Sequence, residues 1–421
     1  MYDGDAAAGR GSTGRSFAAQ IGAWRSLVAR LLWEQEVVSS NLAAPTPMMG
    51  TTTSTIPLAR LQSRLKKQCL LVTDPANVFY LTGFRGISPE ERGATVLVTP
   101  RKVHLFVPKM YQTYGAGLAS VRSRTVTLNV SEREGVLTSF RRRIPQGATV
   151  LFEAGNLTVA EHARIKSKLS VPLRKSGNML EDIRIRKTAA ELRVIRQAVS
   201  LTDQTFGRLV SYLKRTDYQR LTELEVAEKI WQIGRSLGGQ GLSFKPIVAA
   251  GAGSAEPHYA TGQRKLKRGQ PLLLDFGISY GGYHGDLTRC LYLGKAPTDF
   301  RQRYAQVLEA NRRGIEACRP GQTAAAVYAA AVYAAAADYF KDLGVEGQFL
   351  HALGHGVGVE VHEAPRFAPK QATKLEPGMV VTIEPGLYFA GQFGIRIEDY
   401  LVITERGAEA LSSSPKNLVE I

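Results

Sequence analysis

Residues 272–277 read Leu-Leu-Leu-Asp-Phe-Gly, and residues 283–289 read Tyr-His-Gly-Asp-Leu-Thr-Arg. Two glycines between these apolar stretches are typical of a tight turn, so the sequence predicts two paired strands that carry Asp275 and Asp286. A carboxylate at the end of an apolar strand is costly unless it meets a cation or hydrogen-bond donors. The separation of the two aspartates is odd in number, so a bulge or a loop would be needed for both side chains to converge.

The same pattern returns near the C-terminus with two glutamates. Residues 380–386 read Val-Val-Thr-Ile-Glu-Pro-Gly, and residues 394–399 read Gly-Ile-Arg-Ile-Glu-Asp. Glu384 therefore ends one apolar strand, and Glu398 lies in another. Two glutamates on one predicted hairpin repeat the arrangement of the two aspartates.

A glycine-rich stretch between these hairpins contains several histidines. Residues 351–363 read His-Ala-Leu-Gly-His-Gly-Val-Gly-Val-Glu-Val-His-Glu. Glycines on both sides of His355 allow other groups to approach it closely, because glycine has no side chain. His362 is either a second functional group or a packing residue at a strand end, and the residues alone leave both interpretations open.

Together these stretches supply four carboxylates and one imidazole, namely Asp275, Asp286, His355, Glu384 and Glu398. The interior of a sheet does not tolerate four carboxylates without a compensating charge, and two divalent cations would provide it. Oxygen-rich ligands with a single histidine favour Mn²⁺, Co²⁺ or Fe²⁺ over a structural Zn²⁺. Paired metal ions activate water and polarise a carbonyl. The sequence therefore predicts metal-assisted hydrolysis; the alternative is that these acids are scattered salt-bridge partners.

These motifs resemble the metallopeptidases of the pita-bread fold, and most closely their proline-specific branch, prolidase (Xaa-Pro dipeptidase) and aminopeptidase P. The strings that carry the resemblance are LDFG, GYHGDLTR, GHGVGVEVHEAP, TIEPGLY and GIRIEDYLVIT. Residues 74–84 resemble the creatinase-like N-terminal domain of the same enzymes. The resemblance covers about residues 56–421. It implies an α/β N-terminal domain and an α+β catalytic domain with a curved, mainly antiparallel sheet flanked by helices.

The resemblance also implies how the five residues would share two metal ions. Asp275 would bind one ion, and Asp286 and Glu398 would bridge both. His355 and Glu384 would complete the site of the other ion. The implied cofactors are therefore two divalent metal ions, with Mn or Co expected.

Four residues match catalytic positions of the family. His258 matches a histidine near the substrate, and His362 matches one that stabilises the tetrahedral intermediate. Arg396 matches an arginine near the bridging glutamate. Glu384 would manage the proton of the attacking water and pass it to the proline nitrogen.

The resemblance implies three candidate functions. The first is a prolidase that hydrolyses Xaa-Pro dipeptides by attack of a metal-bridging hydroxide; the short N-terminal domain and the 14-residue gap between Glu384 and Glu398 look like small prolidases. The second is an aminopeptidase P that acts on longer peptides. The third is a non-catalytic binding module, which the intact ligand set argues against. The implied partners are short proline-containing peptides and a second copy of the chain in a homodimer.

Composition limits the class of protein. The chain has 421 residues, of which 44% are hydrophobic and 22% charged, which is ordinary globular composition. The sequence contains no stretch of about 18 uninterrupted apolar residues, so no membrane-spanning helix is expected. Three widely spaced cysteines, Cys69, Cys290 and Cys318, argue against a disulfide framework and favour a reducing compartment, hence a cytoplasmic location.

The chain divides into three regions by composition and charge. Residues 1–55 are rich in Gly, Ala, Ser and Thr and are expected to be an unstructured or non-native extension. Residues 56–182 are expected to form the creatinase-like domain, and residues 183–421 the pita-bread domain. The middle region carries 20 Lys and Arg against 9 Asp and Glu, a net charge of +11. We expect a solvated basic face rather than a nucleic-acid site, since no aromatic-interleaved motif accompanies the charge.

The sequence also predicts individual elements. In the N-terminal domain we expect a helix at 57–67, a turn at 74–77, and strands at 69–72, 94–98, 103–107 and 149–152. In the second domain we expect helices at 189–213, 223–237, 300–318 and 323–343. Thr188 followed by Glu191 predicts a capping box at the start of the first of these helices.

Overall fold

The computed structural model describes residues 55–86, 92–130, 135–322, 344, 346–348, 350–367 and 373–421. All described residues belong to the unit Thr51–Ile421. The predicted extension up to residue 54 and the predicted helix at 323–343 lie outside the described residues.

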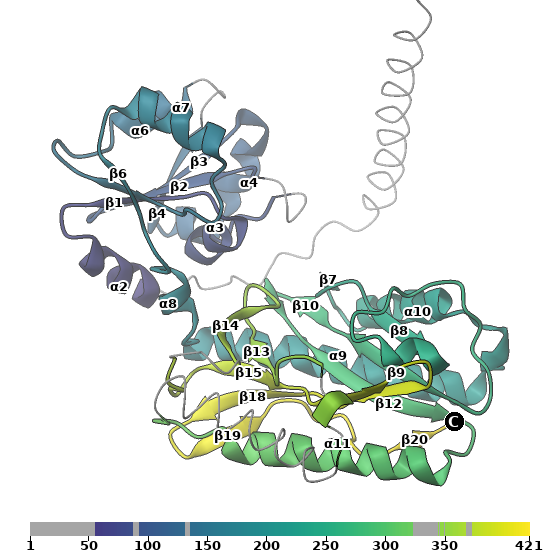
Figure 1. Cartoon of the computed structure of the whole chain (residues 1–421). Coiled ribbons are helices and arrows are strands. Elements are labelled where there is room, and N and C mark those ends of the chain that lie inside the picture. Colours follow the sequence, from purple (N-terminus) through teal and green to yellow (C-terminus); the bar gives the residue numbers. More distant parts are fainter. Residues whose placement is uncertain are drawn as a thin grey trace, which may run out of the picture. The chain divides into compact units, whose positions relative to one another are not determined.

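The N-terminal domain is built on a six-stranded sheet (Figure 1). Its strand order is β4-β3-β2-β1-β5-β6, with β2 antiparallel to both β1 and β3 and the other neighbours parallel. The strands are β1 (Cys69–Val72), β2 (Thr95–Val98), β3 (Val103–Val107), β4 (Val126–Val130), β5 (Val150–Phe152) and β6 (Leu173–Lys175).

Alternate residues of β1 face two different layers of helices. Leu70 and Val72 lie in one hydrophobic core with α2 and α3, whereas Cys69 and Leu71 lie in a second core with α6 and α7. This is the period of two that a strand buried on both faces requires. The helices are α2 (Thr55–Leu65), α3 (Pro75–Thr82), α4 (Gln112–Gly117), α5 (Ala119–Arg122), α6 (Val136–Arg141) and α7 (Val159–Leu169).

The predicted turn at 74–77 was wrong, because α3 begins there. Asp74 caps this helix by accepting hydrogen bonds from the backbone N–H groups of Ala76 (2.9 Å) and Asn77 (3.1 Å). Pro75 occupies the first turn, where its missing N–H is not needed. Gly83, at φ 78°, ends the helix in the left-handed conformation. The residues read as a turn are therefore the start signal of a helix.

Long helices frame the C-terminal domain. They are α9 (Ala189–Arg215), α10 (Glu223–Ser236) and α11 (Thr298–Ala317), and a short helix, α8 (Glu181–Arg184), precedes them. The predicted capping box of Thr188 and Glu191 is present at α9, and Thr222 and Glu225 form another at α10. These caps satisfy backbone N–H groups that the first helical turn leaves without partners.

The sheets of the C-terminal domain are mostly antiparallel. One has the order β20-β12-β9-β8, a second β14-β13-β15-β18-β19, a third β11-β10-β7, and β16 pairs with β17. Their bounds are β7 (Gly241–Leu242), β8 (Ile247–Ala250), β9 (Gln270–Phe276), β10 (Ile278–Tyr280), β11 (Tyr283–His284), β12 (Leu287–Leu293), β13 (His355–Gly356), β14 (Glu363–Arg366), β15 (Val380–Ile383), β16 (Gly386–Phe389), β17 (Phe393–Arg396), β18 (Asp399–Thr404), β19 (Gly407–Ala410) and β20 (Val419–Glu420).

Helices cover both faces of these sheets. Leu272 and Leu274 of β9 pack into a core with α9 and α10, whereas Leu273 packs into the opposite core with α11. The N-terminal half of α9 also packs against β15 and β18, through Ile195 and Val199. Asp275 follows Leu273 by two positions and so lies on the α11 side of β9. No helix within the described residues is long and apolar enough to cross a membrane.

Candidate metal centre

Asp275 and Asp286 lie on one face of the β9–β12 ladder. Thr288 is the partner of Asp275 in this ladder, and Asp286 precedes Thr288 by two positions. Side chains two positions apart on an extended strand point to the same face. The two carboxylates therefore lie diagonally across the predicted hairpin, close enough to share a cation.

The separation of the two aspartates has a structural cause. Strands β10 and β11 form a small hairpin that is inserted between β9 and β12. Gly277 and Gly285 meet at its base, where a Cβ on Gly277 would lie 1.8 Å from the carbonyl oxygen of Gly285. Only glycine permits this approach. The β10–β11 hairpin is therefore the loop that lets the Asp275 and Asp286 side chains converge, and the close contact of Gly277 with Gly285 closes its base.

Glu384 and Glu398 face each other at a break in a second hairpin. The register pairs that flank the break are Ile383 with Asp399 and Gly386 with Arg396. Both ladders therefore continue one register, and the two glutamates occupy opposed positions between them. Side chains at directly opposed positions share a face of the hairpin.

The backbone around each glutamate is tied to a neighbouring segment. The Glu384 N–H donates to the Leu353 carbonyl at 2.8 Å, and the Glu398 N–H donates to the Thr288 carbonyl at 3.2 Å. Leu353 and Thr288 each lie two residues from another predicted metal ligand. These bonds bring the glycine-rich stretch and the two hairpins to one point.

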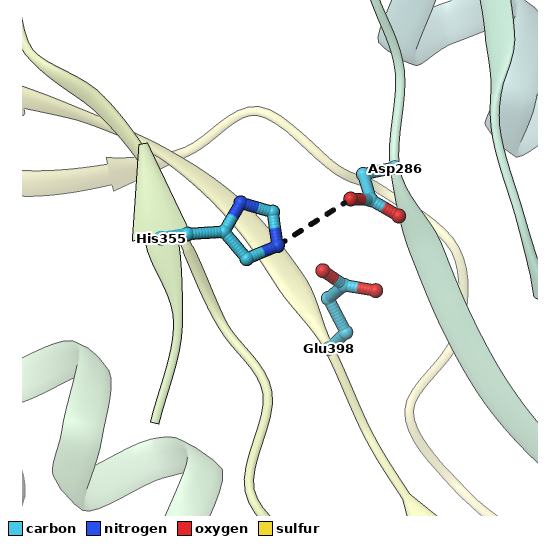
Figure 2. A group of neighbouring side chains, drawn as sticks. All are labelled: Asp286, His355 and Glu398. Carbon is cyan, nitrogen blue, oxygen red and sulfur yellow. Dashed lines mark ion pairs between the residues drawn. The ribbon is translucent and has the colours of Figure 1, made fainter. Parts of the chain in front are cut away.

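Asp286, His355 and Glu398 point toward one another at this point (Figure 2). Each offers a ligand atom, and these atoms lie within 4.8 Å of one another. His355 Nε2 lies 3.8 Å from Asp286 Oδ2 and 3.4 Å from Glu384 Oε1. His355 Nδ1 lies 3.1 Å from the Gly356 carbonyl and can donate to it. That bond leaves Nε2 facing the carboxylates, as in histidines that bind metal.

Arg396 lies behind this group of acids and contacts them in two ways. Its Nη2 lies 2.5 Å from Asp275 Oδ2. Its Nε donates to the Thr288 hydroxyl, which in turn donates to Glu398 Oε2 at 2.9 Å. Its Nη1 donates to the Tyr388 hydroxyl at 2.6 Å. Arg396, which the resemblance placed near Glu398, therefore contacts Glu398 only through Thr288, whereas it contacts Asp275 directly.

Burial and mutual repulsion disfavour the ionised state of these acids. Burial, together with the nearby carboxylates, raises the pKa of Asp286 and of Glu398 well above the ordinary range. Burial also raises the pKa of Glu384 to about 7. Burial and the neighbouring His362 lower the pKa of His355 to about 4, so its imidazole is neutral near pH 7. A neutral imidazole is the form that binds metal.

The charge balance of the site fits divalent cations. Four carboxylates meet at this point, and Arg396 is the one guanidinium in contact with them among the described residues. Without a cation such a group must hold protons, since buried like charges cannot all ionise. Oxygen ligands with one imidazole suit hard to borderline divalent ions. The residues present therefore fit the metal ions that the sequence predicted.

A cavity of about 370 Å³ opens over the carboxylates. His258 and His362 both line it, so the structure brings the two predicted substrate histidines to the same space as the acids. The rings of His355 and His362 lie 4.5 Å apart at an interplanar angle of 78°. Phe244 and Ile247 add an apolar side to the cavity. A small molecule in this space would touch the acids and both histidines.

Sequence reasoning missed two residues at this cavity. Arg366 lines it, is exposed, and makes no ion pair with any residue that the structure describes. His351 also lines it and bonds to the Tyr388 hydroxyl at 2.8 Å, which extends the contact from Arg396. The available signals were the spacing of Arg366, four positions after His362, and that of His351, four positions before His355. Neither spacing is specific enough to stand alone.

Comparisons with known proteins agree with this architecture. The family model described as metallopeptidase family M24 matches residues 193–405, which is half of the chain. The chain belongs to metallopeptidase family M24. The model of the creatinase/prolidase N-terminal domain matches residues 57–186. The predicted pita-bread family, its proline-specific branch and the two-domain fold class are confirmed.

Relatives of this M24 peptidase resemble it over nearly their whole length. A Xaa-Pro dipeptidase of Pyrococcus furiosus is 31% identical, over 83% of this chain and 94% of the relative. A solved Xaa-Pro dipeptidase from Bacillus anthracis has a TM-score of 0.78 and 28% identity, over 87% of this chain and 99% of that one. A solved X-Pro aminopeptidase from Thermotoga maritima has a TM-score of 0.75 and 26% identity, over 86% and 100%.

Proposed function

We propose that this chain is a metal-dependent Xaa-Pro dipeptidase, a prolidase. The observation that carries the proposal is the group of four carboxylates around His355, which has a single arginine as counter-charge and lies at a small cavity. A cavity of this size suits a short peptide rather than a folded protein. The similarity to proteins named Xaa-Pro dipeptidase supports the choice of substrate.

The metal ligands in this proposal are five residues, namely Asp275, Asp286, His355, Glu384 and Glu398. They would hold two divalent ions, with Mn²⁺ or Co²⁺ preferred because the ligands are mostly oxygen. Bound there, the ions supply Lewis acidity and lower the pKa of water to near neutrality. The neutral state of His355 and the buried carboxylates support this assignment.

The remaining chemistry is assigned to side chains of the chain. Glu384 takes a proton from the attacking water and passes it to the proline nitrogen as the peptide bond breaks. His362 donates to the oxygen of the former carbonyl. His258 contacts the substrate at the edge of the cavity. Arg396 holds Asp275, and through Thr288 it orients Glu398.

Arg366 is our candidate for binding the carboxylate of a dipeptide. A dipeptidase needs a cation for that group, and of the two arginines that line the cavity Arg396 is occupied by Asp275. Arg366 is the other, and it makes no ion pair within the described ranges. An Arg366→Met substitution is expected to raise KM for Ala-Pro by about 10-fold or more, as loss of a charged hydrogen bond costs about 1.5–3 kcal/mol.

Aminopeptidase P activity is the second candidate. The solved X-Pro aminopeptidase matches 86% of this chain, and the solved Bacillus anthracis dipeptidase matches 87%. The two activities differ in whether residues beyond proline are accepted, so fold similarity alone separates them poorly. The curated dipeptidase relative, at higher identity, favours the first candidate.

The assembly and location are also proposals. We propose a homodimer in the cytoplasm, as expected for the resemblance and for a chain with few cysteines. Light scattering after gel filtration would measure the mass of the assembly. A monomer at micromolar concentration would reject the dimer without affecting the proposed activity.

The test is hydrolysis of Ala-Pro, Ala-Pro-Pro and Ala-Ala by metal-stripped protein to which Mn²⁺ or Co²⁺ is returned. We expect cleavage of Ala-Pro that depends on the added metal. A Glu398→Gln variant, purified in parallel, controls for contaminating peptidases and should be inactive. Cleavage of Ala-Pro-Pro alone would make the protein an aminopeptidase P. Absence of turnover despite measured metal uptake would reject proline specificity, and absence of metal uptake would favour a binding module.

A further inference from the structure

The hairpin that carries the two glutamates lacks one hydrogen-bond donor. Pro385 and Ile397 are opposed in the shared register, and the Ile397 N–H donates to the Pro385 carbonyl at 3.3 Å. In an antiparallel pair of this type the return bond would run from the N–H of residue 385 to the Ile397 carbonyl. Proline has no N–H, so the Ile397 carbonyl has no donor within the hairpin.

Asn311 of α11 supplies the missing donor. Its Nδ2 donates to the Ile397 carbonyl at 3.2 Å and to the Ile383 carbonyl at 3.0 Å. Each carbonyl belongs to the peptide group that immediately precedes one of the two glutamates. One side-chain amide therefore joins both sides of the hairpin at its break.

The orientation of this amide is fixed by its third partner. Asn311 Oδ1 accepts from Lys416 Nζ at 3.2 Å, which leaves both amide hydrogens for the two carbonyls. Asn311 is fully buried. Gly314, one turn further along α11, has no side chain to hold the helix away: a Cβ there would lie 2.8 Å from Ile383. The helix thus lies close enough for a short side chain to reach the strands.

The peptide groups before both glutamates are therefore held at both ends. Their carbonyls bind Asn311, and their N–H groups bind the Leu353 and Thr288 carbonyls described above. Fixing these two peptide planes fixes the directions in which the Glu384 and Glu398 side chains leave the backbone. The four bonds come from three different segments, so the orientation does not depend on the hairpin alone.

We propose that Asn311 is a positioning residue for the metal centre, which sets the spacing of Glu384 and Glu398 by replacing the backbone donor that Pro385 lacks. This inference rests on the metal site of the proposed function, but not on its substrate. Partners that orient metal ligands from outside the ligand set typically change metal affinity by about 10- to 100-fold when removed. Loss of Asn311 should therefore weaken metal binding as well as stability.

The test compares two asparagines that differ in where they lie. Asn311→Leu removes both donors at similar side-chain size. Asn129→Leu is the matched control, since Asn129 of the N-terminal domain is also buried and its Nδ2 also donates to two carbonyls, those of Leu105 and Thr127. Mn²⁺ affinity of the metal-stripped proteins is measured by titration calorimetry, and Co²⁺ geometry by its visible absorption spectrum. We expect about 10-fold weaker Mn²⁺ binding and a changed Co²⁺ spectrum for Asn311→Leu only.

A second variant covers the case in which Asn311→Leu does not fold. Asn311→Asp keeps the shape and the acceptor for Lys416 but cannot donate when ionised, so it should also weaken Mn²⁺ binding and change the Co²⁺ spectrum. A folded variant at position 311 with wild-type Mn²⁺ affinity and spectrum would overturn the proposal. Failure of the wild-type protein to bind metal would instead reject the metal site, so the two failures are distinguishable.

Discussion

Two buried groups of charges, one around Glu363 and one around His355, are balanced in opposite ways. Glu363 is fully buried, but Arg184 Nη2 lies 2.5 Å and Lys187 Nζ 3.1 Å from its carboxylate. Burial alone would raise the pKa of Glu363, yet Lys187 and Arg184 outweigh burial and lower it to about 2. This group carries its own counter-charges.

Among the carboxylates around His355, Asp286 and Glu398 are as buried as Glu363, but the whole group shares one arginine. The pKa of Asp286 and that of Glu398 therefore move upward, under the same burial that Glu363 experiences. The comparison teaches that burial of an acid does not identify a functional site. Several acids that converge on one point with too little positive charge indicate one, because their combined negative charge calls for a bound cation.

The largest expected difference between the two groups concerns Asp286. Asp286→Asn removes a proposed metal ligand, so kcat/KM for Ala-Pro should fall by at least about 100-fold, the upper end of the loss for partners outside the ligand set. The same change relieves repulsion in metal-free protein, so the melting temperature without metal should not fall. Activity assays and thermal melts with and without Mn²⁺ check both. A lower melting temperature without metal would contradict the shortage of positive charge at this site.

Glu363→Gln should act in the opposite direction on stability. It leaves Lys187, whose side chain is 1% exposed, without its counter-charge, and breaking a buried pair on one side costs about 3–5 kcal/mol. Urea unfolding of the metal-free protein measures this cost. The Co²⁺ spectrum of the folded variant serves as the control and should match the wild type. A loss below about 1 kcal/mol would mean that the Glu363 group does not stabilise the fold.

The stability difference between the wild type and Glu363→Gln should depend on pH. The pKa of Glu363 is about 2 in the fold against an ordinary value of 4.5, so its contribution is complete above pH 4.5 and is lost as the pH falls toward 2. The shift corresponds to about 3 kcal/mol. The stability gap between wild type and Glu363→Gln should therefore narrow by about that amount between pH 6 and pH 2. A gap that stays constant would contradict the lowered pKa.

The smallest effect is expected at an exposed pair. Arg196 Nη2 lies 3.0 Å from Glu409 Oε1, and both side chains are about half exposed. Pairs of this kind contribute about 0–1 kcal/mol because water and salt screen them. Glu409→Gln should therefore change the free energy of unfolding by less than about 0.5 kcal/mol. If Glu409→Gln lowered the free energy of unfolding as much as Glu363→Gln does, burial could not explain the difference between the exposed Arg196–Glu409 pair and the buried Glu363 group.

Much of the fold was predictable because its signals are local. Thr188 with Glu191 indicated the start of α9, and the apolar runs around Asp275 and Glu384 indicated strands. The turn assigned at Asp74 was wrong for a local reason as well, since the residues that make a turn also cap a helix.

The candidate site was predictable only where the residue type alone indicates its chemistry. Acids in apolar strands are conspicuous, so the carboxylates and His355 were selected from the sequence alone. Asn311 was not, because a buried asparagine on an amphipathic helix looks like any polar residue until the carbonyls it binds are known. Arg366 was missed because exposed arginines are common.

Because the two ladders of the glutamate hairpin share one register, the number of residues between Glu384 and Glu398 can change without moving the two side chains out of alignment. The tip of the hairpin, residues 390–392, is exposed, and lengthening it would change the 14-residue interval between Glu384 and Glu398 without altering which residues oppose each other. A single residue inserted in one strand would instead turn one glutamate to the opposite face. The interval between the glutamates can therefore vary in evolution and in engineered variants. A fluorescent label or an affinity tag can be inserted at the tip while the two acids keep their alignment.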